Sequence, residues 1–291
     1  MVEPVVRAAL LEDLGRAGDI TTDAIIGACH PERNAVIPSE VEGQRKSISA
    51  EIVARKPGRV AGLGVAELAF TLLDPGFQFE RLRPDGSDVE ARETVARLNG
   101  SARTLLSAER TALNFLCRLS GVATATRALV RAVEGTGAAI ACTRKTTPGL
   151  RSLEKYAVRV GGGRNHRFGL DDAVLIKDNH IVAAGSVAEA IERVRRAVGH
   201  LVKIEIEVDT LDQLREVLSI GGVDAVLLDN MTEAQLREAV KLAGERVVLE
   251  ASGSVNLESV TAIARTGVHV ISSGSITHSA PALDFGLDFL S

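Results

Sequence analysis

Cationic side chains concentrate in one stretch of this sequence. Between positions 144 and 167 there are seven lysines and arginines against one acid, Glu154, although the whole protein carries a formal net charge of −4. These cations are Arg144, Lys145, Arg151, Lys155, Arg159, Arg164 and Arg167. A local excess of this sign in an acidic chain indicates a small bound polyanion, because nucleic-acid or membrane binding usually needs a broad basic surface. We expect the stretch to lie in loops.

Six short apolar runs in the second half of the chain each precede polar or charged residues. The runs cover residues 138–142, 173–176, 202–206, 225–228, 247–249 and 268–271. The residues after them are Arg144 and Lys145; Lys177, Asp178 and His180; Glu207; Asp229 and Asn230; Glu250, Ser252 and Gly253; and Ser273, Gly274 and His278. Because active sites of parallel α/β proteins form at the carboxyl ends of the strands, we expect one shared site. Any single one of these residues can also be read as part of a solvated loop.

The residue types indicate a phosphorylated ligand. Glu207 and Asp229 suit Mg²⁺, a hard cation that takes carboxylate and substrate oxygens; alternatively, one of them faces positive charge developing on the substrate. The serine and glycine loops at 252–254 and 273–275 each precede a predicted helical segment, where backbone N–H groups can bind phosphate. The histidines do not show the H-E-x-x-H spacing of a zinc site.

The elements that must position these residues differ between the two halves of the chain. In the first half we expect helices at 3–14 and 64–73 and strands at 47–54, 77–82 and 94–98. A long helix should follow, with Ser101 as its N-cap and Gly121 near its end. From about residue 138, apolar runs alternate with helical segments, which predicts βαβ units. About 135 residues are too few for an eight-fold barrel of the usual ~250, so six or seven strands, or an open doubly wound sheet, fit better.

Composition excludes several classes of protein. The chain has 45% hydrophobic residues, no Trp and one Tyr, which argues against base-stacking platforms for nucleic acid. Cys29, Cys117 and Cys142 are odd in number and lack C-x-x-C spacing, so we expect buried thiols rather than disulfides or zinc ligands. No segment approaches the ~20 apolar residues of a membrane span, and we expect no signal peptide, because the first residues lack a basic region followed by an apolar run. We therefore expect a cytoplasmic protein without nucleic-acid or membrane partners.

Several motifs together resemble the quinolinate phosphoribosyltransferases, also called carboxylating nicotinate-nucleotide pyrophosphorylases. The most specific are TRKTTPGLR at 143–151, GGGRNHR at 161–167 and IKDNH at 176–180. Others are EDLG at 12–15, GDITT at 18–22, LNG at 98–100, AERTALNFL at 108–116, LLDN at 227–230 and EASG at 250–253. The resemblance covers nearly the whole chain. It implies phosphoribosyl transfer from 5-phosphoribosyl 1-diphosphate to quinolinate with decarboxylation, giving nicotinate mononucleotide, CO₂ and diphosphate.

The resemblance also implies an architecture and an assembly. Residues 1–120 would form an N-terminal α/β sandwich domain, residues 121–279 an incomplete α/β barrel, and residues 280–291 would pack back onto the first domain. The protein would be a homodimer in which the N-terminal domain of one subunit caps the barrel of the other, with assembly beyond the dimer left open. Mg²⁺ is the implied cofactor.

The family's functional residues carry over onto this sequence by motif. The implied quinolinate pocket consists of Arg144, His166, Arg167 and Lys177, with Lys145 and His180 nearby and Arg110 contributed by the neighbouring subunit. Lys177, Glu207 and Asp229 are the implied catalytic residues, and Glu207 and Asp229 the implied metal ligands. Ser252, Gly253, Ser273, Gly274 and His278 are the implied phosphate-binding residues. Glu205 lies on the same strand face as Glu207, so the sequence leaves open which of the two faces the site.

Three other readings remain at this stage. A paralogue of the same architecture, such as the molybdenum-transport-associated proteins, would use a different acceptor. A Schiff-base aldolase would use Lys145 or Lys177 as its nucleophile. A non-enzymatic sensor would bind a phosphometabolite without turnover. The presence of Arg144, His166 and Arg167 together favours quinolinate.

Overall fold

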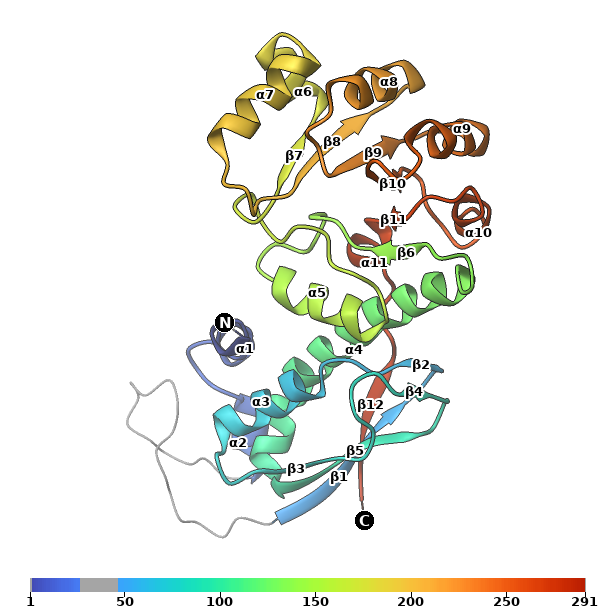
Figure 1. Ribbon diagram of the computed structural model, residues 1–291. Coiled ribbons are helices and arrows are strands. Elements are labelled where there is room, and N and C mark those ends of the chain that lie inside the picture. The colour runs from blue at the N-terminus through green and yellow to red at the C-terminus, as the bar shows by residue number, and fades with distance from the viewer. Residues whose placement is uncertain (1, 27–46, 291) are drawn as a thin grey trace. The chain divides into compact units, whose positions relative to one another are not determined.

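The computed structural model describes residues 2–26 and 47–290, which form two compact units (Figure 1). Unit 1 consists of the chain up to Thr124, Pro148–Gly161 and the segment from Ala280 onward. Unit 2 consists of Ala125–Thr147 and Gly162–Ser279. Cys117 and Cys142 are not in a disulfide, and Cys29 lies outside the described residues.

An antiparallel sheet of four strands forms the centre of unit 1. Its strands, in spatial order, are β12 (Phe285–Phe289), β1 (Ser47–Ala54), β5 (Thr94–Ser101) and β3 (Gln78–Arg81). A separate pair is formed by β2 (Gly58–Arg59) and β4 (Asp88–Val89). The predicted strand at 47–54 is confirmed with the same bounds, and those near 77–82 and 94–98 are confirmed with shifted ends. The sequence missed β12, which pairs with β1 although the two strands lie far apart in the sequence.

The helices of unit 1 are α1 (Val2–Leu14), α2 (Ile20–Ile26), α3 (Leu63–Leu73), α5 (Arg151–Val160) and most of α4 (Ala102–Ala132). Ser101 is the N-cap of α4, since its hydroxyl accepts a hydrogen bond from the Thr104 N–H at 3.1 Å. The expectation that Gly121 lies near the helix end is wrong, because α4 continues to Ala132. A Cβ at Gly121 would lie 2.1 Å from the Pro281 carbonyl oxygen, so this glycine serves close packing of the returning chain.

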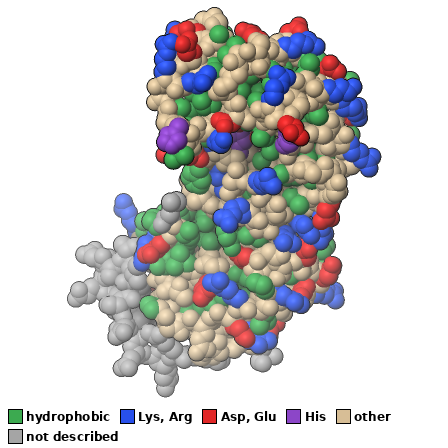
Figure 2. Space-filling view, viewed as in Figure 1, with side chains coloured by type: hydrophobic (Ala, Val, Ile, Leu, Met, Phe, Trp, Pro, Cys, Tyr) green, Lys and Arg blue, Asp and Glu red, His purple; other side chains and the backbone are tan. Residues whose placement is uncertain are grey.

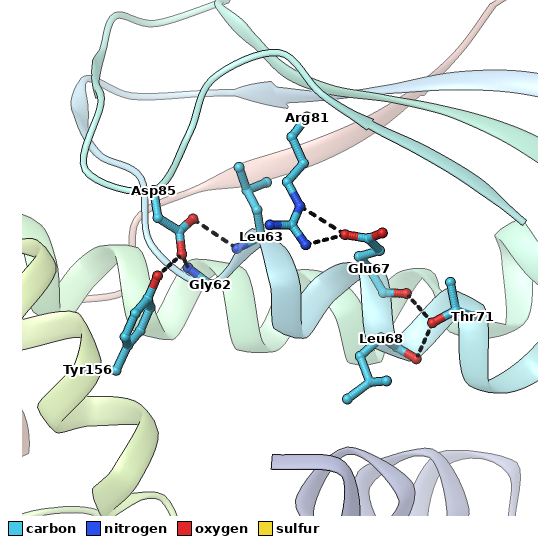
Figure 3. A network of polar contacts seen from close by, with 8 residues as sticks. All are labelled: Gly62, Leu63, Glu67, Leu68, Thr71, Arg81, Asp85 and Tyr156. Carbon is cyan, nitrogen blue, oxygen red and sulfur yellow. Dashed lines mark hydrogen bonds and ion pairs between the residues drawn. The ribbon is translucent and has the colours of Figure 1, made fainter.

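A carboxylate network joins three parts of unit 1 (Figure 3). Asp85 accepts hydrogen bonds from the N–H groups of Gly62 and Leu63, at 2.8 and 3.1 Å, at the N-terminus of α3. The Tyr156 hydroxyl on α5 donates to the same carboxylate at 2.6 Å. Burial, with the hydrogen bond to Asp85 next in importance, raises the pKa of Tyr156 to about 12. Asp85 thus satisfies two helix-terminal donors and ties α5 to α3.

Unit 2 contains a parallel sheet of six strands among the described residues. The strands in spatial order are β6 (Ala139–Ala141), β11 (Val270–Ser272), β10 (Val248–Ser252), β9 (Ala225–Asp229), β8 (Ile204–Val208) and β7 (Val174–Ile176). Each of the six apolar runs forms one strand, with ends that differ by at most three residues. Along the described chain β6 and β7 do not pair; the outer edge of β6 makes an isolated bridge from Ala141 to Arg164. The sheet is therefore a six-stranded barrel that hydrogen bonds do not close, which agrees with the predicted incomplete barrel of six or seven strands.

Helices follow the strands of unit 2 and lie on the outer side of the sheet (Figure 1). They are α6 (Asp178–Ala184), α7 (Val187–Ala197), α8 (Leu211–Ile220), α9 (Glu233–Ala243), α10 (Val260–Ala264) and α11 (Ser275–His278). Ser186, Thr210 and Thr232 cap α7, α8 and α9 by accepting a hydrogen bond from the backbone N–H three residues on. Helix α8 buries Leu214 and Val217, each worth roughly 1.5–3 kcal/mol of stability. In the described ranges, no helix is both long and apolar enough to span a bilayer.

Candidate active site

Strand β8 directs two glutamates to the inner face of the unit 2 sheet. Its Ile204, Ile206 and Val208 are buried, whereas Glu205 and Glu207 between them are half-buried. Because side chains alternate along a strand, both glutamates share one face. The register aligns Glu207 with Leu227 on β9 and Leu227 with Glu250 on β10, so Glu250 belongs to the same face.

Lys177 and Glu207 form an ion pair at the carboxyl edge of the sheet. Lys177 directly follows β7, and its ammonium contacts the Glu207 carboxylate. Its backbone N–H donates to His180 Nδ1 at 2.9 Å, which fixes the start of α6. The Lys177 side chain is 44% exposed and that of Glu207 16%, so the pair borders solvent. An amine held by a carboxylate is a poor Schiff-base nucleophile, which argues against an aldolase that uses Lys177.

His166, Glu205 and Glu250 form a second cluster on the same face of the sheet. His166 Nε2 lies 2.9 Å from Glu205 Oε2 and 3.7 Å from Glu250 Oε1. His166 Nδ1 accepts a hydrogen bond from the Arg167 N–H at 2.8 Å. Burial, reinforced by the neighbouring Glu205 carboxylate, raises the pKa of Glu250 to about 7, and His166 opposes the shift. Glu205 and Glu207 thus share a face but have different partners.

Two arginines of the predicted pocket lie close enough to repel each other. Burial first, and then the charge of Arg144, lower the pKa of Arg167, while Asp172 and Glu205 oppose this. One Arg167 nitrogen also donates to the Ala173 carbonyl at 3.3 Å. Arginine side chains in general stay charged throughout the physiological pH range. Two partly buried like charges favour an anion with two acidic groups.

Lys145, Gly274 and His278 meet at the carboxyl ends of β6 and β11. The Lys145 carbonyl accepts a hydrogen bond from the Thr277 hydroxyl at 2.7 Å. A Cβ at Gly274 would lie 2.9 Å from Lys145 Cδ and 3.1 Å from the His278 ring. Glycine at position 274 therefore lets the Lys145 side chain and the His278 ring keep their observed positions. The adjacent Ser273 is buried and its hydroxyl contacts that of Ser275 at 2.7 Å.

Asp229 is held by the loop that follows its strand. Asn230 has a left-handed backbone, with φ 52°, and its amide donates to the Asp229 carboxylate at 2.8 Å. The Asn230 N–H donates to the Ser252 carbonyl at 3.0 Å. A Cβ at Gly253 would lie 2.1 Å from Asn230 Oδ1, so this position requires glycine. Asp229, Ser252 and Gly253 thus occupy one corner of the sheet edge.

Two expectations about the loops are wrong. The basic stretch is not all loop, because α5 covers 151–160 and Lys155 is buried there. Arg151, Lys155 and Arg159 therefore belong to a helix of unit 1, while Arg144, Lys145, Arg164 and Arg167 belong to unit 2. The loop at 252–254 does not directly precede a helix either, since α10 begins only at Val260. On the face shown in Figure 2, acidic and basic side chains are interspersed.

The predicted site residues divide between the units. Arg110 is exposed on α4 in unit 1, whereas all the others belong to unit 2. The sequence places Asn230 and Glu250 among the residues that follow the strands but assigns no role to them or to Thr277, although each contacts a predicted site residue. The position of Glu250 was recognisable, because a glutamate inside the apolar strand β10 needs a partner. The roles of Asn230 and Thr277 depend on contacts between loops, which have no sequence pattern.

An incomplete parallel α/β barrel with cations, carboxylates and glycine loops at one edge defines a class of protein that binds anionic substrates at the strand ends. Family models narrow the class. The quinolinate phosphoribosyl transferase N-terminal domain matches residues 19–120 and the C-terminal domain of the same family matches residues 122–288. The chain belongs to the quinolinate phosphoribosyltransferase family.

Individual relatives agree over nearly the full length. The chain is 45% identical to a probable nicotinate-nucleotide pyrophosphorylase [carboxylating] of Bacillus subtilis, covering 96% of this chain and 90% of that protein. It is 43% identical to the corresponding Mycobacterium leprae protein, covering 97% and 95%. The crystal structure of NadC from Streptococcus pyogenes superposes with a TM-score of 0.88 at 38% identity, covering 100% and 98% of the two chains. The Francisella tularensis nicotinate-nucleotide pyrophosphorylase gives 0.89 at 37% identity, covering 99% and 96%.

Proposed function

We propose that this protein transfers the phosphoribosyl group of 5-phosphoribosyl 1-diphosphate to the ring nitrogen of quinolinate and releases CO₂ and diphosphate, forming nicotinate mononucleotide. The observation that carries the proposal is the approach of Arg144 and Arg167 beside the carboxylate-bearing edge of the sheet. A planar dicarboxylate fits two guanidinium forks and cancels their repulsion. Family membership supports the same reaction.

The carboxylates of the site suit the ribose. Displacement at the anomeric carbon passes through an oxocarbenium-like transition state, as glycosyl transfer generally does. Asp229, oriented by Asn230, and Glu207, paired with Lys177, would oppose that positive charge. The loops at Gly253 and Gly274, with Lys145 and His278, would hold the phosphates.

The acidic pair also fits Mg²⁺. Asp229 and Glu207 offer only oxygen donors, which this hard cation prefers. Bound there with substrate oxygens, Mg²⁺ would neutralise charge on the leaving diphosphate. The chain's own contribution is to aim these carboxylates, through the Asn230 amide and the Lys177 ammonium.

Lys177 would assist the loss of CO₂. Once its nitrogen carries the ribose, the pyridinium ring can accept the electron pair that the departing carboxylate leaves on the adjacent carbon. An ammonium beside that carbon would stabilise the carbanion and then donate the proton that replaces CO₂. The contact with Glu207 would hold the Lys177 side chain in position for this step.

We also propose a cytoplasmic homodimer in which Arg110 of one subunit completes the pocket of the other. Mixing inactive Arg110→Ala and Lys177→Ala proteins should restore roughly a quarter of wild-type activity, because random exchange gives half heterodimers with one intact site each. Subunit exchange is followed by mass spectrometry of an isotope-labelled partner. Complete exchange without recovered activity would refute the shared site.

The direct test is an activity assay. Purified protein is incubated with quinolinate, 5-phosphoribosyl 1-diphosphate and Mg²⁺, and nicotinate mononucleotide and CO₂ are quantified. Nicotinate, which lacks the second carboxylate, should not replace quinolinate. Turnover with another acceptor but not with quinolinate would instead support a paralogous transferase.

A further inference from the structure

His166 is held through both nitrogens of its ring. Nδ1 accepts the Arg167 N–H at 2.8 Å, and Nε2 lies 2.9 Å from Glu205 Oε2. A nitrogen that accepts a backbone N–H carries no proton, so the proton of the neutral ring resides on Nε2. His166 therefore donates from Nε2 to Glu205, which fixes one tautomer.

The same cluster has the composition of a metal site, and the tautomer argues against that reading. Donor atoms of His166, Glu205 and Glu250 lie within 4.8 Å of one another. A histidine that binds metal normally donates its other ring N–H to an acceptor. Here the other nitrogen accepts, so Nε2 has no lone pair for a cation. The cluster holds a proton between His166 and Glu205 instead.

The carboxylates act on a loop that lies beside the open side of the sheet. His166 and Arg167 belong to the segment between α5 and β7, and Arg164 in that segment bridges to Ala141 at the edge of β6. Glu205 lies on β8, which packs in the sheet through β7 and β9. Glu250 on β10 is only 5% exposed and approaches the same His166 nitrogen from a second strand. The ring is thus anchored to the rigid sheet from two sides.

We propose that Glu205, backed by Glu250, is a positioning residue: it holds His166 as the Nε2–H tautomer, which fixes the Arg167 backbone and so aims the Arg167 guanidinium at a substrate carboxylate. The assignment of Arg167 to substrate rests on the proposed function, whereas the tautomer does not. Glu205 and Glu207, two residues apart on one strand, then have separate tasks: Glu205 orients the acceptor pocket and Glu207 serves Lys177.

The tautomer is tested on the wild-type protein. Long-range ¹H–¹⁵N spectra of ¹⁵N-histidine-labelled protein at pH 7 should show the His166 ring protonated on Nε2 and unprotonated on Nδ1. The signals are assigned by their loss in His166→Gln and, without any variant, by backbone correlations to Arg167. A ring protonated on Nδ1, or on both nitrogens, would overturn the proposal whether or not the protein uses quinolinate.

The positioning role is tested by kinetics with three variants. Glu205→Ala removes the acceptor and should raise the quinolinate KM by roughly tenfold or more, as expected for a lost hydrogen bond to a charged group. The KM for 5-phosphoribosyl 1-diphosphate should change less than about twofold if the effect is confined to this loop. Glu205→Gln keeps an oxygen acceptor and should recover most of the loss. Glu233→Ala, at an exposed ion pair on α9, is the matched control and should match wild type.

Two kinetic outcomes count against the proposal. One is a folded Glu205→Ala enzyme with an unchanged quinolinate KM. The other is a folded Glu205→Gln enzyme as impaired as Glu205→Ala, which would make charge rather than hydrogen bonding the cause. If Glu205→Ala does not fold, the quinolinate KM of Glu205→Gln and the wild-type ¹H–¹⁵N spectrum still test the proposal. If wild type has no activity with quinolinate, the proposed function fails, and the spectrum alone decides on the tautomer.

Discussion

The Asp85 network of unit 1 and the His166 cluster of unit 2 use carboxylates in opposite ways. Asp85 accepts three hydrogen bonds, two from the N-terminus of α3 and one from Tyr156. In the other cluster, two carboxylates, Glu205 and Glu250, approach a single N–H of His166. The Asp85 network has three donors for one carboxylate, so it stabilises the fold. In the His166 cluster, Glu205 and Glu250 repel each other, and other interactions in unit 2 must offset that repulsion.

The pKa values of the titratable groups in the two clusters also differ. The pKa of Tyr156 is raised to about 12, chiefly by burial, so its hydroxyl keeps its proton throughout the physiological range. Burial and Glu205 raise the pKa of Glu250 to about 7, so this carboxyl changes charge near neutrality. The repelling carboxylates and the carboxyl that titrates near neutrality both belong to the His166 cluster, where a ligand is expected. This is typical of functional sites rather than structural ones. Variants can test this division.

The largest effect should come from Lys177→Ala. We expect kcat/KM to fall roughly 100- to 1000-fold, as when a charge-stabilising group is removed from other active sites. The melting temperature should change little, because the Lys177 side chain is 44% exposed. Steady-state kinetics measures kcat/KM and calorimetry measures the melting temperature, both on the same preparation. If the variant loses stability in proportion to its loss of activity, Lys177 stabilises the fold rather than the reaction.

Glu250→Gln should flatten the pH dependence of stability. The pKa of Glu250 in the folded protein, about 7, lies above its ordinary value of 4.5. Its contribution to stability is therefore complete below about pH 4.5 and is lost as the pH rises through 7. Relative to wild type, the variant should gain roughly 3 kcal/mol in free energy of unfolding between pH 4.5 and 8. Urea unfolding at several pH values measures this, and parallel curves would contradict the assignment.

Arg144→Lys should weaken quinolinate binding by about 1–3 kcal/mol, because lysine cannot make a forked contact with a carboxylate. Isothermal titration calorimetry with quinolinate measures the change. Thermal stability should stay close to that of wild type, since the positive charge is kept. An unchanged affinity would remove Arg144 from the acceptor pocket.

Asp85→Ala should act on stability alone. Loss of the cap on α3 should cost about 0.5–2 kcal/mol in free energy of unfolding. Arg81→Ala, which breaks the neighbouring exposed pair with Glu67, is the control and should cost no more than about 1 kcal/mol. Chemical denaturation of both variants, with kcat/KM measured alongside, gives the comparison. An Asp85→Ala protein of normal stability but reduced kcat/KM would end the distinction between the two regions.

The sequence predicted the strands of unit 2 well because each contains a short group of buried apolar residues, which is a local property. The polar residues after them converge as expected, since parallel strands bring their carboxyl ends to one edge. Gly121 was misread because a glycine in a helix looks the same whether it ends the helix or admits a neighbouring chain. Its neighbour, Pro281, is 160 residues away in sequence.

Long-range pairings were also beyond the sequence. The β12–β1 pairing depends on two segments with no shared pattern, and α5 was hidden because its cations look like those of the surrounding loops. In the site, residue types predicted which groups take part but not their pairing. That Glu205 contacts His166 while Glu207 contacts Lys177 follows from register and loop geometry.

The pairing of β1 with β12 also determines when the sheet of unit 1 can be completed during translation. Arg55 and Asp288, which join the ends of these strands, are 233 residues apart. At about 5–20 residues per second, the ribosome needs on the order of ten to fifty seconds between the two strands. Throughout that interval one edge of β1 lacks its partner and offers unpaired N–H and C=O groups to other nascent chains. The sheet of unit 1, although encoded first, is completed last, and its exposed edge is where misassembly on the ribosome would begin.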